Sequence, residues 1–362
     1  MEDSVSYKKF KIKSKVNSYE VLFVKNSKSV LSKITTENDF FIVDSYINKN
    51  YADLFNDFNN IRIEIKTEEK SKEYKSIAKI ISKLVSKGIR KNSKIIAVGG
   101  GITQDIASFI SLILYRGLNW IYFPTNLLSQ CDSCIGSKLS VNFLNYKNLL
   151  GGFYPPQKIF IDTKFLDTLN QIDIYSGLGE MLHYFLVSEN LKDYEFFKKK
   201  IQLFLSGQTK IEELIFRSLK IKRKMIQFDE FDEGPRNIFN YGHTFGHALE
   251  SVTKYSIPHG ISVAYGIDLA NLISVDLGFL DMSTRNEIRE LCQIIFRKKA
   301  LPKIKLEDYE IALKRDKKNI GQNLGLILTR GVGKMFKHHI QYSQIKQRIS
   351  DFFENKLYKN SL

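Results

Sequence analysis

The sequence predicts an α/β N-terminal domain with a parallel sheet over residues 1–165 and an all-α C-terminal domain over residues 166–362. The length of 362 residues favours two domains, because a domain takes roughly 150 residues. Short apolar runs alternate with helical stretches in the first third, and long helical periodicities dominate after about residue 165. A composition of 43% hydrophobic and 26% charged residues is that of a globular protein, which excludes wholesale disorder and fibrous architectures.

The N-terminal elements follow from local patterns. Apolar runs at 21–24 and 40–43 predict buried strands, and apolar residues at helical spacing predict a helix within 70–90. Residues 94–98 predict a strand that leads into three glycines, a helix over 105–115 and another strand over 120–124. A strand, a turn, a helix and a strand make a βαβ unit, which is why we expect a parallel sheet.

The C-terminal half is predicted to be helical by long periodic stretches at 190–228, 243–255, 259–278 and 283–298. No internal repeat or low-complexity linker separates the halves. A chain of this kind usually places its site in the cleft between domains.

The net charge of +16 is compatible with nucleic acid, an anionic membrane or a phosphate-bearing substrate. The lysines are spread along the chain and form only short clusters, at 198–200 and 222–224, which favours a solvated surface. The apolar run at 106–115 is about half a membrane span, and the N-terminus lacks the apolar region of a signal peptide. We therefore expect a cytoplasmic protein with no membrane or nucleic-acid partner.

The three cysteines cannot form a disulfide framework, which fits a reducing compartment. Cys131 and Cys134 form a C-x-x-C pair, but one pair supplies only two ligands of a structural zinc site. Small buried residues are the favoured interpretation, and a redox or metal role is the alternative.

The turn Gly99-Gly100-Gly101 follows a buried strand and precedes a helix, so its backbone and the helix N-terminus can approach a pyrophosphate closely. The pattern is neither the G-x-G-x-x-G fingerprint nor a Walker A loop. A dinucleotide site and a tight structural turn both remain open.

Three of the six histidines lie close together, and two of them, His243 and His247, are four residues apart on a predicted helix. Thr244 stands where a zinc peptidase would have its general base, so that class is disfavoured. With His259 and the carboxylate of Glu180, the set resembles a catalytic zinc site. The alternative is that these are ordinary core or surface histidines.

Several basic and amide residues accompany this metal candidate, and such groups suit a small, anionic, polyhydroxylated phosphate. They are Lys138, Lys147, Asn148, Lys222, Arg236 and Asn240.

The motifs together resemble the 3-dehydroquinate synthase family of sugar phosphate cyclases. The resemblance is carried by residues 99–156, SGLGEM at 176–181, RNIFNYGHTFGHALES at 236–251, IPHG at 257–260 and DKK at 316–318. It implies an NAD-binding domain, a helical metal- and substrate-binding domain, a site between them and a homodimer.

The resemblance also implies the roles of individual residues. Zinc or cobalt would be bound by Glu180, His243 and His259. NAD would be bound by Asp44, Glu69, Lys72, Gly100, Gly101, Asp105, Thr125, Asn126, Lys138, Lys147 and Thr168. The substrate would contact Asp132, Lys138, Asn148, His183, Lys222, Arg236, Asn240, His247, Lys317 and Lys318.

The implied reaction is a carbon–oxygen lyase step of the shikimate pathway, in which a seven-carbon keto-acid phosphate (DAHP) becomes 3-dehydroquinate. NAD transiently oxidises a ring hydroxyl, phosphate leaves by β-elimination, the ketone is reduced back, and ring opening is followed by an intramolecular aldol closure. Lys138, Asn148, Asn240 and His247 would hold the phosphate, whereas Lys222 and Arg236 would face the carboxylate and hydroxyls.

Four positions depart from the family pattern: Gln104 and Ser137 replace glycines, Asn126 replaces a threonine and His183 replaces a lysine. We expect Gln104 to place a side chain near the pyrophosphate turn and His183 to face substrate with a pKa near neutrality. These departures leave three alternatives to the DAHP reaction. They are a cyclase for another sugar phosphate of secondary-metabolite or polysaccharide biosynthesis, a metal-dependent polyol dehydrogenase, and a basic nucleic-acid-binding or scaffold protein without activity.

Overall fold

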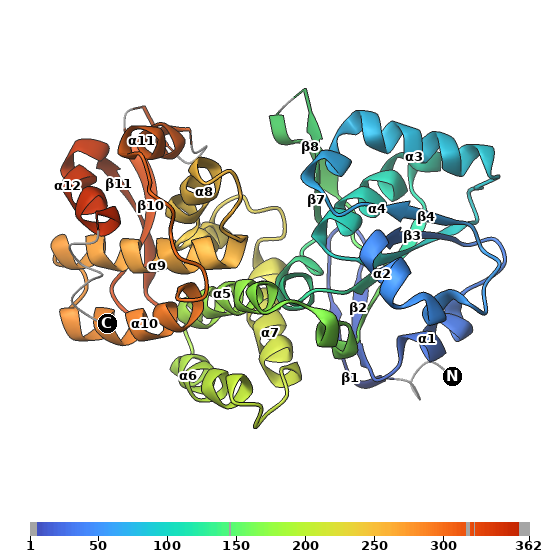
Figure 1. Ribbon diagram of the computed structural model, residues 1–362, viewed down its shortest axis with the longest axis horizontal. Helices are drawn as coiled ribbons and strands as arrows, with labels where there is room; N and C mark the ends of the chain where they lie inside the picture. The colour runs from blue at the N-terminus through green and yellow to red at the C-terminus, as the bar shows by residue number, and fades with distance from the viewer. Residues whose placement is uncertain (1–5, 145, 316–318, 322, 355–362) are drawn as a thin grey trace. The chain divides into compact units, whose positions relative to one another are not determined.

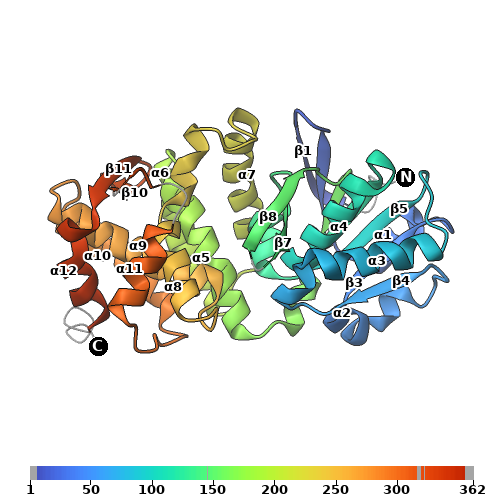
Figure 2. The ribbon, with the colours of Figure 1, turned by 90° about the horizontal axis from the view of Figure 1, so that it is seen from above.

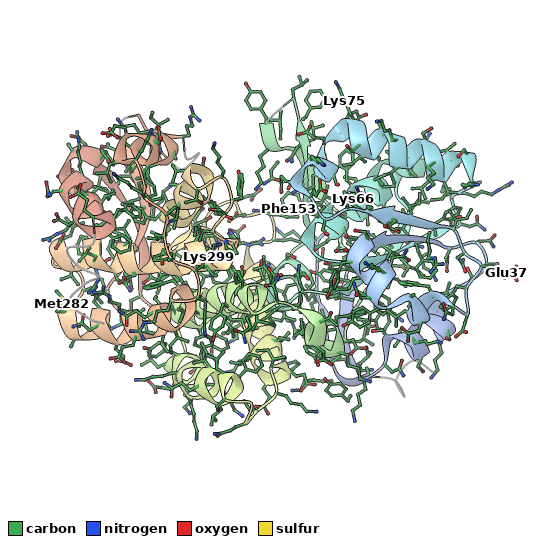
Figure 3. All side chains as sticks on the ribbon, viewed as in Figure 1. Glu37, Lys66, Lys75, Phe153, Met282 and Lys299 are labelled. Carbon is green, nitrogen blue, oxygen red and sulfur yellow. The ribbon has the colours of Figure 1, made fainter. Side chains whose placement is uncertain are left out.

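The computed structural model describes residues 6–144, 146–315, 319–321 and 323–354. The chain divides into two compact units, one of Met1–Leu169 with Arg223–Phe231 and one of Asn170–Lys222 with Asp232–Leu362 (Figure 1). In the described ranges no helix is long and apolar enough to cross a membrane. Exposed lysines of the first unit include Lys66, in a loop, and Lys75, on a helix (Figure 3).

The first unit is built on a seven-stranded sheet in the order β1-β2-β9-β6-β5-β3-β4. Neighbouring strands are parallel, except for the antiparallel pair β1–β2. The strands are β1 (Ser6–Ile12), β2 (Tyr19–Val24), β3 (Phe40–Asp44), β4 (Arg62–Ile65), β5 (Lys94–Gly99), β6 (Asn119–Pro124) and β9 (Lys158–Ile161). Central strands such as β3 are buried along their whole length, which explains their unbroken apolar runs. The predicted parallel α/β domain is confirmed.

Four α-helices belong to this sheet: α1 (Ser27–Ile34), α2 (Ser45–Asn50), α3 (Tyr74–Ser86) and α4 (Gly101–Ile113). The sheet order reverses beside β3, whose neighbours are β4 on one side and β5 on the other. Ligands of open α/β sheets bind at such a reversal, outside the carboxyl ends of the strands. Asp44 ends β3 and the glycine turn follows β5, so both lie at this edge.

A β-hairpin that the sequence does not predict, β7 (Lys138–Phe143) with β8 (Tyr146–Phe153), forms a separate antiparallel sheet in the first unit. A bridge between Glu73 and Asn142 joins it to the segment before α3. The hairpin thereby brings Asn142 to Glu69 and Asn148 to Lys72.

The second unit contains α5 (Gln171–Val187), α6 (Leu191–Leu205), most of α7 (Glu212–Phe228), α8 (His243–Val252), α9 (His259–Asp276), α10 (Met282–Phe296), α11 (Leu306–Lys314) and α12 (Tyr342–Phe353). Helix α9 is buried continuously from Gly260 to Ser274, because α5, α8 and α10 pack around it (Figures 1 and 2). The predicted helical domain is confirmed, but it is not wholly α. Strands β10 (Asn323–Thr329) and β11 (Met335–Gln341) form an antiparallel hairpin, and the apolar β10 packs against α9.

Residues 223–231 belong to the first unit, although the helical periodicity at 190–228 assigns most of them to the C-terminal domain. The reason is a buried carboxylate, Glu230, which accepts hydrogen bonds from Ser14 Oγ (2.6 Å), Lys15 N (2.7 Å) and Ser137 Oγ (2.6 Å). The Phe231 ring also packs on Phe153, with 4.8 Å between ring centroids.

Candidate active site

The glycine turn of the first unit leads into the first turn of α4, where Gly101 and Ile102 are half-buried. Gly100 is the N-cap, and a Cβ at this position would overlap Asn126 Nδ2, so a larger residue would displace the Asn126 amide. Asn126 in turn accepts a hydrogen bond from Ser129 N (2.8 Å) and fixes the segment after β6. The first-turn N–H groups of a helix have no partner within it, so this end of α4 offers donors for a pyrophosphate.

The Gln104 side chain bonds to Ser133, which lies beside the glycine turn because a Cβ on Gly101 would be 3.9 Å from Ser133 Oγ, in agreement with the expectation from sequence. Gln104 Nε2 donates to Ser133 O (2.7 Å), and Ser133 Oγ donates to Gln104 Oε1 (2.9 Å). These two bonds link α4 to the turn at Ser129–Ser133, which carries Asp132. The departure at 104 therefore adds a cross-link between two parts of the first unit.

Ser137 adopts a left-handed backbone conformation, with φ of +64°, at a position where the resemblance implies glycine. This conformation costs a non-glycine residue roughly 1–2 kcal/mol. The buried bond from Ser137 Oγ to Glu230 Oε1 (2.6 Å) offsets that cost. Lys138, which follows, has an exposed side chain.

The carboxyl edge of the sheet gathers several predicted NAD contacts. Asp44, Gly100 and Thr125 follow or end the adjacent strands β3, β5 and β6. Asp44 Oδ1 accepts from Tyr46 N (2.8 Å), and burial raises the pKa of this carboxyl despite that bond. Thr168 contacts helix α2 and the residue that caps it. Tyr46 Oη donates to Thr168 O, and Tyr51 Oη lies 2.9 Å from Thr168 Oγ1.

A polar network joins a second group of predicted contacts in the first unit. Lys72 is buried and its Nζ lies 2.6 Å from Asp105 Oδ2 and 2.9 Å from Asn148 Oδ1. Burial raises the pKa of Asp105, and Lys72 opposes that rise. At the edge of the network, Lys147 Nζ lies 3.8 Å from Glu69 Oε1. The hairpin thus unites residues far apart in sequence, with Asn148 beside Lys72.

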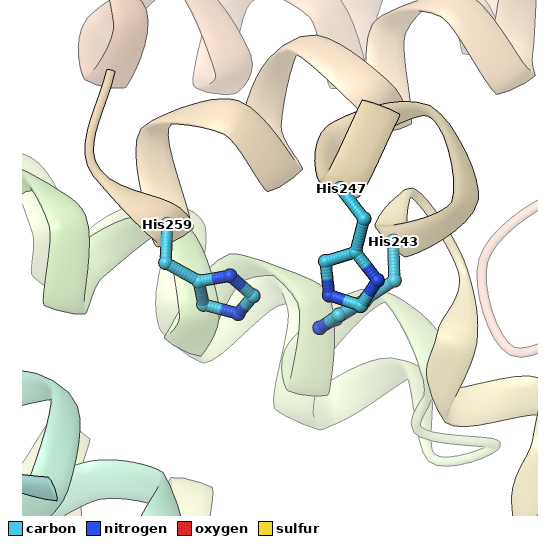
Figure 4. A group of neighbouring side chains, drawn as sticks. All are labelled: His243, His247 and His259. Carbon is cyan, nitrogen blue, oxygen red and sulfur yellow. The ribbon is translucent and has the colours of Figure 1, made fainter. Parts of the chain in front are cut away.

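The histidine cluster lies in the second unit, where helices α8 and α9 direct His243, His247 and His259 toward one another (Figure 4). One ligand atom from each histidine lies within 4.8 Å of the others. Glu180 on α5 joins them, because its Oε2 is 3.6 Å from His243 Nε2 and 3.3 Å from His259 Nε2. These are four possible donors for one divalent metal ion.

The separations around Glu180 Oε2 fit a metal. Zinc–ligand distances of 2.0–2.1 Å in a tetrahedron place neighbouring donor atoms about 3.4 Å apart. Glu180 Oε2 is moreover buried and has no hydrogen-bond partner among the residues described. A buried carboxylate oxygen without a partner is costly, and a cation between it and the two imidazoles would satisfy it.

In both predicted histidine ligands, the Nδ1 atom, which faces away from Glu180, lies near an oxygen acceptor. His243 Nδ1 lies 3.1 Å from Tyr241 O, and His259 Nδ1 lies 3.2 Å from Glu250 Oε2. Such acceptors keep the hydrogen on Nδ1 and leave Nε2 free for a metal. Glu250 is not among the residues predicted from sequence, although its place on α8 seven residues after His243, on the same helix face, is a signal that could have found it.

The electrostatics of the cluster follow from burial and mutual contact. Burial alone would raise the pKa of Glu180, but His243 and His259 outweigh it and hold this pKa well below its usual range. Burial alone would lower the pKa of His259, but Glu250 and Glu180 hold it well above its usual range. Glu180 is therefore ionised, and His259 must lose a proton when its Nε2 binds a metal.

Glycines hold the helices of the cluster at backbone contact. A Cβ on Gly179 would overlap Gly260 O, and one on Gly260 would overlap Ser176 O, so α5 and α9 cross without an intervening side chain. Gly242, with φ of +77°, meets Gly266 in the same way between the start of α8 and α9. Each of these contacts is adjacent in sequence to, or packs beside, a candidate ligand.

His183 does not behave as the sequence predicts. The ring is 0% exposed, and burial together with the neighbouring His243 lowers its pKa to about 3. The expected imidazolium that titrates near neutrality is therefore wrong, because this ring stays neutral over the physiological range. Its Nδ1 faces Glu180 Oε1 at 3.6 Å.

The other predicted substrate contacts are only partly gathered. In the second unit Lys222 and Arg236 are buried, and Lys222 Nζ lies 5.9 Å from the centre of the Tyr184 ring. Asn240 Nδ2 donates to Asn237 O (3.1 Å). Lys317 and Lys318 lie outside the described residues.

The C-x-x-C pair is buried within the turn after β6. The thiols of Cys131 and Cys134 donate weakly to the carbonyls of Leu128 and Gln130, both at 3.6 Å. These contacts agree with the interpretation of small buried residues.

Comparison with known proteins decides the family. Residues 62–176 match the profile of the 3-dehydroquinate synthase N-terminal domain, and residues 177–319 match that of the C-terminal domain. The chain belongs to the 3-dehydroquinate synthase family. The resemblance predicted from sequence is confirmed.

Members of the 3-dehydroquinate synthase family with curated names are similar over most of the chain. The 3-dehydroquinate synthase of Thermoanaerobacter pseudethanolicus is 35% identical over 249 residues, 68% of this chain and 70% of that protein. The enzyme of Dictyoglomus turgidum is 38% identical over 247 residues, 68% of this chain and 69% of that protein.

Solved structures support the same fold. A 2-deoxy-scyllo-inosose synthase bound to carbaglucose-6-phosphate, NAD+ and Co2+ superposes with a TM-score of 0.81 at 23% identity, covering 96% of this chain and 100% of that one. ValA, a 2-epi-5-epi-valiolone synthase from Streptomyces hygroscopicus with NAD+ and Zn2+, also gives 0.81, at 20% identity and with 95% and 99% coverage. An iron-containing alcohol dehydrogenase gives 0.62 at 13% identity, covering 93% and 97%.

Proposed function

We propose that this protein is a 3-dehydroquinate synthase, which converts DAHP to 3-dehydroquinate and phosphate with NAD and zinc or cobalt. The observation that carries the proposal is the donor set around Glu180 Oε2 in a chain of this family. That buried oxygen lies 3.3 and 3.6 Å from the Nε2 atoms of two imidazoles whose Nδ1 atoms face other acceptors.

In this proposal Glu180, His243 and His259 would hold the metal, and the N-terminal turn of α4 would bind the pyrophosphate of NAD. When bound, NAD would take up and return a hydride, and the metal would lower the pKa of the substrate hydroxyl. The set Asp44, Gly100 and Thr125 supports the NAD assignment, because it lies where the strand order reverses.

The protein's own cations would hold the substrate anions. Lys222 and Arg236 are buried, so a carboxylate facing them would form charge-assisted hydrogen bonds away from bulk water. Lys138, Asn148, Asn240 and His247 would bind the phosphate, which itself would take the proton removed in the elimination. Lys138 and His247 are exposed, so a phosphate that arrives from solvent can reach them.

The test is turnover of DAHP by zinc-loaded protein with substoichiometric NAD. We expect many equivalents of phosphate per NAD, 3-dehydroquinate in the NMR spectrum and no growing NADH absorbance, since the hydride returns in each cycle. His243→Ala is the matched inactive control. Absence of 3-dehydroquinate from protein verified to contain zinc and NAD would reject the assignment.

A cyclase for another sugar phosphate is the second candidate, and the observation that favours it is His183. Because burial lowers the pKa of this imidazole to about 3, the position offers the substrate no cation where the resemblance implies a lysine. Turnover of a hexose or heptulose phosphate that carries no carboxylate, together with no turnover of DAHP, would support this candidate. Stoichiometric NADH from a polyol would instead support a dehydrogenase. We also propose a homodimer, as expected of the family, which light scattering on the same protein tests.

A further inference from the structure

His183 is an imidazole enclosed by rings. It lies on α5, one turn after Glu180, and its ring centroid is 4.9 Å from that of Tyr184, 5.7 Å from that of Phe239 and 4.8 Å from that of His243. All three contacts are edge-to-face, so they fix the plane of the imidazole. The ring has no route to solvent, because it is 0% exposed.

The two oxygens of Glu180 face different partners. Oε2 faces His243 and His259, whereas Oε1 faces His183 Nδ1 at 3.6 Å. Within the described part of the chain, neither ring nitrogen of His183 has a hydrogen-bond partner. Buried polar groups are almost always bonded, so a nitrogen aimed at a carboxylate oxygen this close needs an explanation.

We propose that His183 is a positioning residue for Glu180, whose Oε1 it holds through an Nδ1–H hydrogen bond so that Oε2 alone faces His243 and His259. An ionised carboxylate only accepts hydrogen bonds, so the nitrogen that faces it must carry the hydrogen. An approach of about 0.7 Å brings the pair to hydrogen-bonding distance. The inference rests on the proposed metal site.

The restraint would decide how many oxygens the carboxylate gives to a metal. A carboxylate that is free to rotate can bind through both oxygens, whereas one oxygen occupied by a donor leaves a single ligand atom. The lysine that the resemblance implies at this position would contact the substrate, whereas His183 contacts the proposed metal ligand Glu180 instead. Lys222 and Arg236, which are both buried, keep their proposed contacts with the substrate.

The experiment measures metal binding rather than turnover, in full-length protein. Zinc affinity is determined by competition with a chromophoric chelator, and the cobalt form is examined by its visible spectrum. The variants are His183→Leu, which removes the donor, and His183→Asn, whose amide nitrogen occupies the position of Nδ1. Phe239→Leu is the packing control, because Phe239 contacts the His183 ring.

We expect His183→Leu to weaken zinc binding by roughly 10–100-fold, the usual effect of removing a partner of a metal ligand. Its cobalt bands should weaken and shift as Glu180 binds through two oxygens. His183→Asn and Phe239→Leu should stay within roughly threefold of the wild-type affinity, since both keep the donor to Glu180.

Unchanged zinc affinity and cobalt bands in His183→Leu would overturn the inference. Equal losses in His183→Leu, His183→Asn and Phe239→Leu would overturn it too, because packing alone would then explain them. Loss of a nitrogen ligand in the X-ray absorption of His183→Leu would show direct ligation instead. Wild-type protein that binds zinc without converting DAHP refutes the proposed function and leaves this inference standing, whereas protein that binds no zinc refutes both.

Discussion

Replacing Glu250 with alanine should weaken zinc binding in a pH-dependent way. Glu250 Oε2 lies 3.2 Å from His259 Nδ1, and the two side chains are 13% and 30% exposed. Loss of such a partner costs roughly 10–100-fold in metal affinity, which is about 1.4–2.7 kcal/mol. The partial exposure of His259 lets water replace the acceptor, so we expect the lower half of this range.

A second effect of the same substitution has the opposite sign. Glu250 helps to hold the pKa of His259 above its usual range, so metal binding must displace a proton from His259 when the pH is below that pKa. Without Glu250 the pKa falls and this competition weakens. The loss of affinity in Glu250→Ala should therefore be small at pH 6 and should grow as the pH rises toward the raised pKa of the wild-type protein.

Chelator competition at several pH values measures both effects. Glu250→Gln keeps an oxygen acceptor without the charge and should lie between the wild type and Glu250→Ala. The exposed Glu290 on α10 supplies a control, Glu290→Gln, which loses a carboxylate away from the cluster. The reasoning fails if Glu250→Ala binds zinc like the wild type at high pH, or if its deficit shrinks as the pH rises.

Three further predictions concern other parts of the molecule. His243→Ala should lose both zinc and phosphate release, whereas His247→Ala should retain one zinc per chain, as measured by elemental analysis. Loss of zinc from His247→Ala would instead favour a ligand set of His243, His247 and His259. Gln104→Gly removes both hydrogen bonds to Ser133 and adds a helical glycine, so urea unfolding should show a free energy of unfolding lower by about 2–3 kcal/mol. Ser133→Ala should lower it by about 1 kcal/mol. Unfolding midpoints equal to that of the wild type would contradict the cross-link. Arg236→Leu should lower kcat/KM for DAHP by roughly 10²–10³ and affect a sugar phosphate without a carboxylate far less, and equal losses on both would refute carboxylate binding.

The parallel core of the first unit could be predicted because each buried strand is an unbroken apolar run that can be recognised from its own residues. The run at 94–98, its glycine turn and the helix that follows carry their own periodicity. Strand β8 carries no such pattern, because it is largely exposed and is held by antiparallel pairing with β7. The place of residues 223–231 was equally hidden, since their helical periodicity says nothing about Ser14 and Ser137, which bind Glu230.

The candidate site likewise has a part that the sequence predicts and a part that it does not. The spacing of His243 and His247 and the family motifs around Glu180 and His259 predict the cluster from the sequence alone, and the fold brings these side chains together. The surroundings of His183 could not be predicted, because the ring is closed off partly by Phe239, which comes 56 residues later in the chain. The three-residue spacing on α5 places this imidazole beside Glu180, but only the packing of distant segments shows that the ring is closed off from solvent.

The glycine contacts between α5, α8 and α9 have a consequence for how this enzyme can change over evolution. Backbone touches backbone at Gly179 and Gly260, and again at Gly242 and Gly266, so no side chain there can be enlarged or trimmed to tilt one helix against another. Substitutions elsewhere in the second unit can reshape the space around a substrate while the candidate ligands keep their mutual spacing. We therefore expect any side chain at these glycines to separate the candidate ligands and to weaken metal binding before it alters specificity.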